Sequence, residues 1–405
     1  MDMYTVPTKG KAFLRHIKRH IVSPVHRIAA ISPPEFALLC QQELLGLSIE
    51  QSSISEAGVE FSGRLADCYA SNLWLRTASR IVLRVDRFRA GAVEQLFNRV
   101  ASFRWELWLN PDIPLHIKAY VKNSRIQHTG LIEKTVLDGM RKRFAELHLN
   151  LPNDWSLRHS ERCRQAAVVQ RVNVHVADNY SELSLDTSGA HLHQRGYRLR
   201  HTGAPVRETV AAAILIKAGW CGERPLVDGM CGAGTVPVEA SLRARHLPPG
   251  VGRSFLFEQW PAFQLKTWSH LVRKARQEAL PRSPVPIIAV DRDPEAIAVA
   301  RQNAKAAGTE EDILWQQKDF FLFRPQSMSL SPGLLFLNPP YGKRLAEDEN
   351  LFERLGGHLR RFFRGWQVAI MAPDRAHALH LKINSARYWR IRHGGIPVVA
   401  VLAKL

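Results

Sequence analysis

Short apolar strands alternate with helices through the carboxyl-terminal half of the chain, and this alternation constrains the fold more than any other feature. Strand-like segments occur at 225–228, 287–291, 313–317, 334–338, 367–372 and 397–402. A helical segment at 207–219 precedes the first of them. Strands that are apolar along their whole length and separated by helices are typical of a mostly parallel sheet covered on both faces. The sequence therefore predicts an α/β domain in this half.

The amino-terminal half mixes strands and helices in a different order. Alternating apolar residues and helical periodicity predict strands at 25–31, 58–61 and 81–85 and a helix at 33–47. A second unit follows, with a helix at 93–100, a strand at 114–121, a long basic helix at 124–144 and paired strands at 168–176 and 181–186. This half is predicted to be α+β.

The chain carries a large and unevenly distributed positive charge. It has 56 Lys and Arg against 37 Asp and Glu, for a net charge of +19. The excess is +9 in residues 1–200, +1 in 201–353 and +9 in 354–405. Such a surplus is typical of proteins that bind a polyanion, either nucleic acid or an anionic membrane surface. A nearly neutral reaction centre between two basic surfaces fits an enzyme that acts on a polyanion, although solvated helix faces would give the same counts.

The sequence also limits where the protein works. No apolar run reaches the roughly 18–20 residues of a membrane-spanning helix. Five scattered cysteines, none in a C-x-x-C pair, favour a reducing compartment over a disulfide framework or a zinc site, so we expect a cytoplasmic protein. Residues 1–24 are basic without an apolar core, which leaves an RNA-contacting arm or an organelle transit peptide.

A glycine-rich turn follows the first strand of the α/β half. Asp228 ends the strand, and Gly229, Gly232 and Gly234 come before a helix at 236–245. The spacing G-x-x-G-x-G differs from the dinucleotide motif, and no phosphate-loop lysine follows. A nucleoside ligand without a pyrophosphate, such as S-adenosylmethionine, fits this turn, and a tight turn without a ligand is the alternative. Met230 and Cys231 are expected to line the pocket.

Two further acids follow strands of the same predicted sheet. Asp291 ends the next strand, where a carboxylate can accept hydrogen bonds from both ribose hydroxyls. Asp319 follows another strand and could accept from an adenine amine, with Phe320 beside it. The long gap between Asp228 and Asp291 predicts an insertion near 246–285, which we expect to be a helical cover packed on the sheet.

The most informative motif is Asn338-Pro339-Pro340-Tyr341, directly after an apolar strand. The prolines end the strand and fix the backbone, so the Asn338 side-chain oxygen and the Pro339 carbonyl can converge on one point. Two acceptors about 3 Å from an exocyclic amine would bind both of its hydrogens and aim the nitrogen lone pair at an electrophile. Tyr341 can stack on an extruded base.

In their order along the chain, Asp228, Gly234, Asp291, Asp319 and the Asn338 motif resemble the set found in class I S-adenosylmethionine-dependent amino-methyltransferases. Segments 188–198 and 204–209 resemble the entry segment of a narrower group, the THUMP-domain RNA guanine-N2 methyltransferases, best known from bacterial 23S ribosomal RNA. Segments 72–78 and 124–130 resemble the ferredoxin-like and THUMP segments of that group. The likeness covers roughly residues 25–405.

The resemblance implies a division of the chain into four parts. These are a basic arm (1–24), a ferredoxin-like domain (25–88), a THUMP RNA-binding domain (89–185) and a Rossmann-like methyltransferase domain with the insertion (186–405). It also implies that Pro205 and Glu208 help wall the pocket for S-adenosyl-L-methionine. One departure is Phe36, where the family tends to have a glycine, and another is that only one catalytic domain is present where some fused relatives have two.

The expected partner is structured RNA, with 23S ribosomal RNA favoured over transfer RNA. The residues expected to contact it are Arg125, Lys134, Arg141, Lys142, Arg143, Arg195 and Arg198. N6-adenine methylation is the alternative reaction, because an adenine amine satisfies the same two acceptors. A non-catalytic RNA-binding or ribosome-assembly factor is the alternative class. No metal is expected, because no Cys or carboxylate lies at ligand spacing from His191 and His193, and a monomer is favoured.

Overall fold

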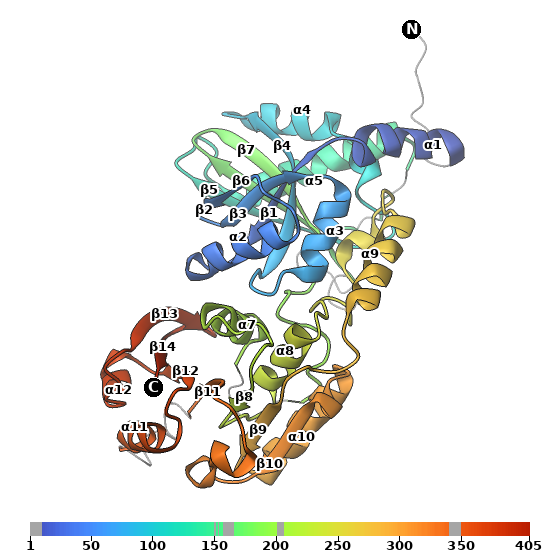
Figure 1. Cartoon of the computed structure of the whole chain (residues 1–405). Coiled ribbons are helices and arrows are strands. Elements are labelled where there is room, and N and C mark those ends of the chain that lie inside the picture. The colour runs from blue at the N-terminus through green and yellow to red at the C-terminus, as the bar shows by residue number, and fades with distance from the viewer. Residues whose placement is uncertain (1–9, 150, 153, 157–165, 201–205, 340–349) are drawn as a thin grey trace.

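Two sheets with their helices build the molecule, one in each half of the chain (Figure 1). The computed structural model describes residues 10–149, 151–152, 154–156, 166–200, 206–339 and 350–405. Helix α1 (Gly10–Ile17) and the π-helical turn η1 (Lys18–Val22) precede the first sheet. Within these ranges, none of the helices has the length and apolar character of a membrane span.

The first sheet has seven strands in the order β2-β3-β1-β4-β7-β6-β5. Their bounds are β1 (His26–Ile31), β2 (Ser52–Ser55), β3 (Gly58–Gly63), β4 (Arg80–Arg89), β5 (Leu115–Lys122), β6 (Gln170–Ala177) and β7 (Tyr180–Asp186). One apolar core joins one face of this sheet to α2 (Ala37–Gly46), α3 (Leu65–Trp74), α4 (Val93–Ser102) and α5 (Thr129–Glu146). On the opposite face, Arg27 and Arg84 form ion pairs of 3.0–3.3 Å with Glu60 and Glu182.

Strand β4 joins the two α+β units of the amino-terminal half into one body. It pairs antiparallel with β1 on one side and with β7 on the other. The expected division between residues 88 and 89 falls inside this strand. The sequence did not reveal the shared sheet, because the partner of a strand depends on pairing across almost a hundred residues.

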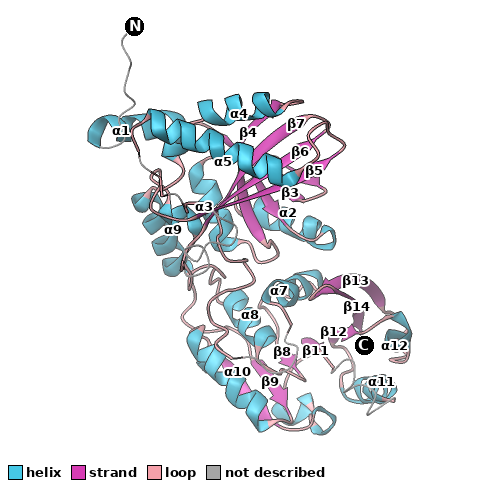
Figure 2. Ribbon diagram, turned by 180° about the vertical axis from the view of Figure 1, so that it is seen from behind, coloured by secondary structure: helices cyan, strands magenta, loops and turns pink. Residues whose placement is uncertain are grey.

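The second sheet has the order β10-β9-β8-β11-β12-β14-β13. The strands are β8 (Leu226–Asp228), β9 (Ile287–Asp291), β10 (Ile313–Gln317), β11 (Leu334–Leu337), β12 (Gln367–Ala372), β13 (Arg387–His393) and β14 (Ile396–Lys404). One face packs on α7 (Glu208–Lys217), α8 (Thr235–Ala244) and α10 (Pro294–Ala306), the other on α11 (Leu351–Phe362) and α12 (Arg375–Leu379). This double cover (Figure 2) confirms the expected Rossmann-like α/β fold.

The insertion is helical but covers a different surface from the expected one. It contains η4 (Leu256–Gln259) and α9 (Leu265–Glu278). The Phe257 ring stacks on Tyr69 of α3 at 4.3 Å, and the Trp260 ring meets Trp108 edge-on at 5.3 Å. Phe257 and Trp260 therefore belong to the core of the first half. The prediction that the insertion packs on the second sheet was wrong, because its aromatic side chains are buried against the first.

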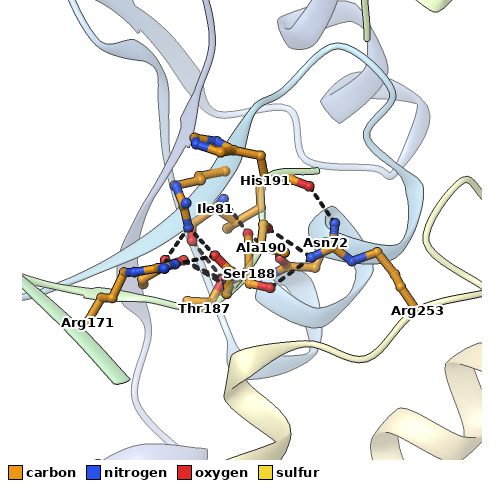
Figure 3. A network of polar contacts seen from close by, with 11 residues as sticks. Asn72, Ile81, Arg171, Thr187, Ser188, Ala190, His191 and Arg253 are labelled. Carbon is orange, nitrogen blue, oxygen red and sulfur yellow. Dashed lines mark hydrogen bonds and ion pairs between the residues drawn. The ribbon is translucent and has the colours of Figure 1, made fainter. Parts of the chain in front are cut away.

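A polar network at the link after β7 holds the halves together (Figure 3). The Arg253 guanidinium, from the insertion, donates to the carbonyls of Ser188, Ala190, His191 and Gln194 at 2.7–3.1 Å. From the first half, the Asn72 side chain donates to Thr187 Oγ1 at 2.7 Å and accepts from Ser188 Oγ at 2.6 Å.

A second contact between the halves lies at β13. The Phe36 and Trp389 rings are 5.5 Å apart, and the Arg392 N–H donates to Glu35 Oε1 at 2.9 Å. Phe36 is 1% exposed, so the residue that departs from the family pattern is buried at this contact.

Candidate active site

The carboxyl ends of four neighbouring strands carry the polar residues that the sequence analysis singled out. Asp228 ends β8, Asp291 ends β9, Asp319 follows β10 by two residues, and Asn338 follows β11 directly. Strand β8 pairs in parallel with β9 and β11, and β9 pairs in parallel with β10. These four residues therefore lie along one edge of the second sheet, where α/β folds bind their ligands.

The glycine-rich loop between β8 and α8 is fixed to the strands on both sides. The Gly229 N–H donates to the Phe336 carbonyl of β11, and the Cys231 N–H donates to the Val290 carbonyl of β9, each at 3.0 Å. Gly234 ends the loop with a left-handed backbone (φ 79°), after which α8 begins. Hydrogen bonds to both neighbouring strands therefore hold the loop.

Two glycines of this loop are required by packing. A Cβ at Gly229 would lie 2.4 Å from Cδ2 of Phe320, and a Cβ at Gly234 would lie 2.8 Å from Cβ of Ala300. A side chain at either position would displace the residues after β10 or helix α10. These contacts account for the glycines at both ends of the loop.

The Asp291 carboxylate links the loop to β9 and keeps acceptor capacity. Its Oδ2 accepts from the Gly232 N–H at 2.8 Å, and its Oδ1 accepts from the Asp293 N–H at 3.0 Å. Two carboxylate oxygens have about four lone-pair positions, so each can accept a second bond. Asp291 is half-buried, so a ligand hydroxyl can reach it.

Asp228 and Cys231 are buried beneath the loop. Burial raises the pKa of Asp228 well above its usual range, and the neighbouring Asp291 charge raises it further. A cationic ligand group at this edge would favour the ionised carboxylate. Burial also raises the pKa of the Cys231 thiol, which keeps it a thiol and argues against a nucleophile. Met230, half-buried, donates its N–H to Asp228 Oδ1 at 3.4 Å.

Asp319 starts the short helix η6 (Phe320–Leu322), and its Oδ1 accepts from the Phe321 N–H at 2.8 Å. Asn338 is half-buried and Pro339 is buried directly after β11. Pro340 and Tyr341, the other two members of the predicted acceptor site, lie outside the described residues, as does Pro205.

Glu208 forms a buried ion pair beside the loop. Its Oε1 lies 3.1 Å from Nε of Arg198, and burial raises the pKa of Glu208. Arg198 also donates to Thr235 Oγ1, in the first turn of α8, and to the Val206 carbonyl, both at 2.8 Å. Arg198 was predicted to contact RNA, but the structure engages its guanidinium in supporting the loop.

Asn303 of α10 is a supporting residue that the sequence analysis missed. It is 1% exposed, and its Nδ2 donates to the Ala233 carbonyl of the loop at 3.0 Å. Its Oδ1 accepts from the Leu199 N–H at 2.9 Å. The signal available in the sequence was a single polar residue among the alanines of an otherwise apolar helix face.

The residues predicted to contact RNA fall into two groups. Arg125, Lys134 and Lys142 are exposed, and Arg141 is half-buried. Arg143 pairs with buried Glu106, with 3.0 Å from its Nε to Oε2. Arg195 is 3% exposed, and its guanidinium donates to the carbonyls of Leu192 (2.6 Å) and Arg76 (2.7 Å). Burial removes Arg195 from any surface, so the structure contradicts an RNA contact there.

Two known families match the chain. The RMKL-like methyltransferase domain matches residues 195–397, and the RlmL ferredoxin-like domain matches residues 27–82. A putative RNA methyltransferase of Synechocystis is 31% identical over 91% of this chain and 96% of its own length. The ribosomal RNA large subunit methyltransferase K/L of Methylococcus capsulatus is 34% identical over 91% of this chain and 50% of its own length. The chain therefore spans about half the length of the K/L relative.

Solved structures share the fold over nearly the whole chain. A predicted N6-adenine-specific DNA methylase from Listeria monocytogenes superposes with a TM-score of 0.80 and 25% identity over 98% of this chain and 99% of its own. A putative methyltransferase, SMU.472, crystallised with SAH, superposes with a TM-score of 0.81 and 24% identity over 94% of this chain and 98% of its own.

Proposed function

The chain belongs to the RMKL-like methyltransferase family, and from this premise we propose that it transfers a methyl group from S-adenosylmethionine to N2 of a guanine in large-subunit ribosomal RNA. The observation that carries the proposal is the row of Asp228, Asp291, Asp319 and Asn338 along one sheet edge. The three acids are proposed to bind the nucleoside of the cofactor, and Asn338 is proposed to bind the amine. Their positions along one edge would bring the two reactants together.

The residues present fit this cofactor. Asp291 keeps acceptor positions for two neighbouring ribose hydroxyls, and Asp228 is a buried acid that a cationic ligand would stabilise in its charged form. The loop spacing lacks the features of pyrophosphate binding. When bound, S-adenosylmethionine supplies an electrophilic methyl group. The names of the Synechocystis and Methylococcus relatives, an RNA methyltransferase and a ribosomal RNA methyltransferase, support an RNA acceptor.

The role that we propose for the motif is to hold and orient an amine. The Asn338 side-chain oxygen and the Pro339 carbonyl each accept one hydrogen of the guanine amine, and its lone pair then points at the methyl carbon. Methyl transfer would form the N–C bond as the S–C bond of the donor breaks, and the methylated amine would then lose a proton to water. Asn338 cannot take that proton at neutral pH, so the residue contributes position and electrostatics.

Adenine N6 is the second candidate acceptor. The Listeria structure is named as a predicted N6-adenine-specific DNA methylase, and an adenine amine has the same two hydrogens for the two acceptors as a guanine amine. The full chain, unmodified 23S ribosomal RNA transcript and S-adenosylmethionine should yield N2-methylguanosine on nucleoside mass spectrometry. N6-methyladenosine as the product would overturn the guanine assignment. If calorimetry shows no binding of S-adenosylhomocysteine to this chain, the alternative class, a non-catalytic RNA-binding factor, would replace the proposed enzyme.

A further inference from the structure

The hairpin of β13 and β14 extends beyond the edge that holds the candidate active site. Pairing across β11, β12, β14 and β13 places Phe336 in register with Arg387. Asn338 lies two residues beyond Phe336, whereas Arg390 and Arg392 lie three and five residues beyond Arg387. The two arginines therefore extend about 3 and 10 Å past the level of Asn338, and three strand spacings, about 14 Å, separate β13 from β11.

Three arginines and a tyrosine form one surface on this hairpin and the adjoining helix. Side chains alternate along a strand, so Tyr388, Arg390 and Arg392 project from the same face of β13, and both arginines are exposed. The Arg375 guanidinium of α12 lies 5.3 Å from the centre of the Tyr388 ring. We call Arg375, Tyr388, Arg390 and Arg392 the arginine platform.

Few acids lie beside this platform. Residues 354–405 hold ten Lys and Arg but one acid, Asp374, which bonds to His377 at 2.9 Å. From the first half, the Glu35 carboxylate accepts the backbone N–H of Arg392 at 2.9 Å. Within the described parts of the chain, no carboxylate forms an ion pair with the three arginines of the platform. Surface arginines without acidic partners are available to a polyanion.

Contacts with the first half fix the position of the hairpin. Trp389 packs on Phe36 at 5.5 Å and lies under the Lys217 ammonium at 5.6 Å. Glu35 accepts the outward-pointing N–H of Arg392 at 2.9 Å. Both views show β13 on the side of the second sheet that faces the first half (Figures 1 and 2). These contacts therefore fix the hairpin that carries the platform.

We propose that the arginine platform binds the phosphates of the RNA strand that carries the reacting base. The proposal rests on the proposed function, because it needs an RNA whose base enters beside Asn338. Arginine forks suit phosphate oxygens, and the Tyr388 ring under Arg375 offers a flat surface for a neighbouring base. The platform would position the strand while the Asn338 motif holds the base.

The test compares two charge pairs on the same hairpin. Arg390→Ala with Arg392→Ala removes two charges at the active-site end, and Arg387→Ala with Lys404→Ala removes two exposed charges at the opposite end. Binding of the full chain to unmodified 23S ribosomal RNA transcript is measured between 50 and 200 mM salt. We expect the first pair to weaken binding at least ten-fold and to reduce the slope of log K against log salt by roughly 2. The second pair should change affinity less than two-fold.

The variant Arg390→Lys with Arg392→Lys keeps the charge and should bind within about three-fold of wild type. Calorimetry with S-adenosylhomocysteine verifies that each variant is folded. The proposal would be overturned if both double variants lost the same RNA affinity. An unchanged salt slope for the Arg390 and Arg392 variant would also overturn it. Binding needs no methyl transfer, so a different nucleoside product would overturn the guanine assignment and leave the platform standing.

Discussion

An amide side chain can hold an amine but cannot deprotonate it at neutral pH. If Asn338 only holds the amine, its substitution should lower methyl transfer without changing cofactor affinity. In Asn338→Ala, loss of one oriented acceptor should lower methyl transfer at least 100-fold, about the effect of removing one oxyanion-hole donor. Affinity for S-adenosylhomocysteine should stay within about two-fold in calorimetry. Turnover within a few-fold of wild type would contradict the assigned role.

His358 provides a second measurement at the residue scale. Burial, and then the Arg324 charge, lower the pKa of His358 to about 4, against an ordinary 6.5. Between these values the unfolded chain binds more protons than the folded one, so stability is complete above pH 6.5 and falls as the pH drops towards 4. From pH 7 to pH 5, wild type should lose about 1–2 kcal/mol more than His358→Gln in urea unfolding. His380→Gln, at an exposed position, is the control for the substitution itself.

Arg195 and Arg390 mark the limit of sequence reasoning at this scale. Each lies among other arginines in a mixed segment, and the charge count treats them alike. The fold buries the first at 3% exposure and leaves the second on the surface. Asp291 and Asn338 could be predicted to lie at the sheet edge, because each directly follows an apolar strand. Burial of an arginine depends instead on acceptors from distant segments, such as the Arg76 carbonyl.

At the scale of elements, the loop between β8 and α8 allows a matched comparison. Gly234 and Gly308 both have left-handed backbones, with φ of 79° and 69°. A Cβ at Gly308 meets nothing within 4 Å, whereas one at Gly234 lies 2.8 Å from Ala300 Cβ. Gly308→Ala should cost about 1–2 kcal/mol of unfolding free energy from backbone strain alone. Gly234→Ala should cost more and also weaken S-adenosylhomocysteine binding, and equal costs would show that the contact with α10 is unimportant.

Three strands of the second sheet, β9, β10 and β12, have the bounds that the sequence predicted. β9 and β12 are apolar runs that are buried on both faces. β10 lies at the edge of the sheet, and Ile313 is its one buried residue. Strand β13 was missed because arginines take three of its seven positions, which leaves no apolar run. Helix α5 begins at Thr129, five residues later than expected, because Ser124 and Arg125 instead bond to Asn179 in the turn between β6 and β7.

For the whole molecule, the fold of each half could be predicted but the join between the halves could not. The insertion was expected on the sheet nearest in sequence, yet Phe257 and Trp260 belong to the other core. Such docking depends on the shape of a surface built by α3 and Trp108. A residue such as Arg253, which reaches four carbonyls of the link between the halves, has no local sequence signature.

The buried pair of Arg195 and Glu239 tests this join. Their atoms lie 3.4 Å apart, and Arg195 also bonds to the Arg76 carbonyl of the first half. Arg195→Met leaves a buried carboxylate with the Tyr197 hydroxyl at 3.1 Å, so unfolding free energy should fall by about 3 kcal/mol. Adding Glu239→Gln should recover part of that loss, because a neutral amide then replaces the buried carboxylate.

Arg200→Ala is the matched control, because its 3.8 Å pair with Glu295 is 57% and 74% exposed. It should change stability by less than about 0.5 kcal/mol. Urea unfolding of the wild type and the three variants measures these differences, and RNA affinity is measured on the same proteins below the transition. Folded Arg195→Met should bind 23S ribosomal RNA as wild type does. A loss of RNA affinity without a loss of stability would indicate that Arg195 contacts RNA, and it would contradict the role of Arg195 in joining the halves.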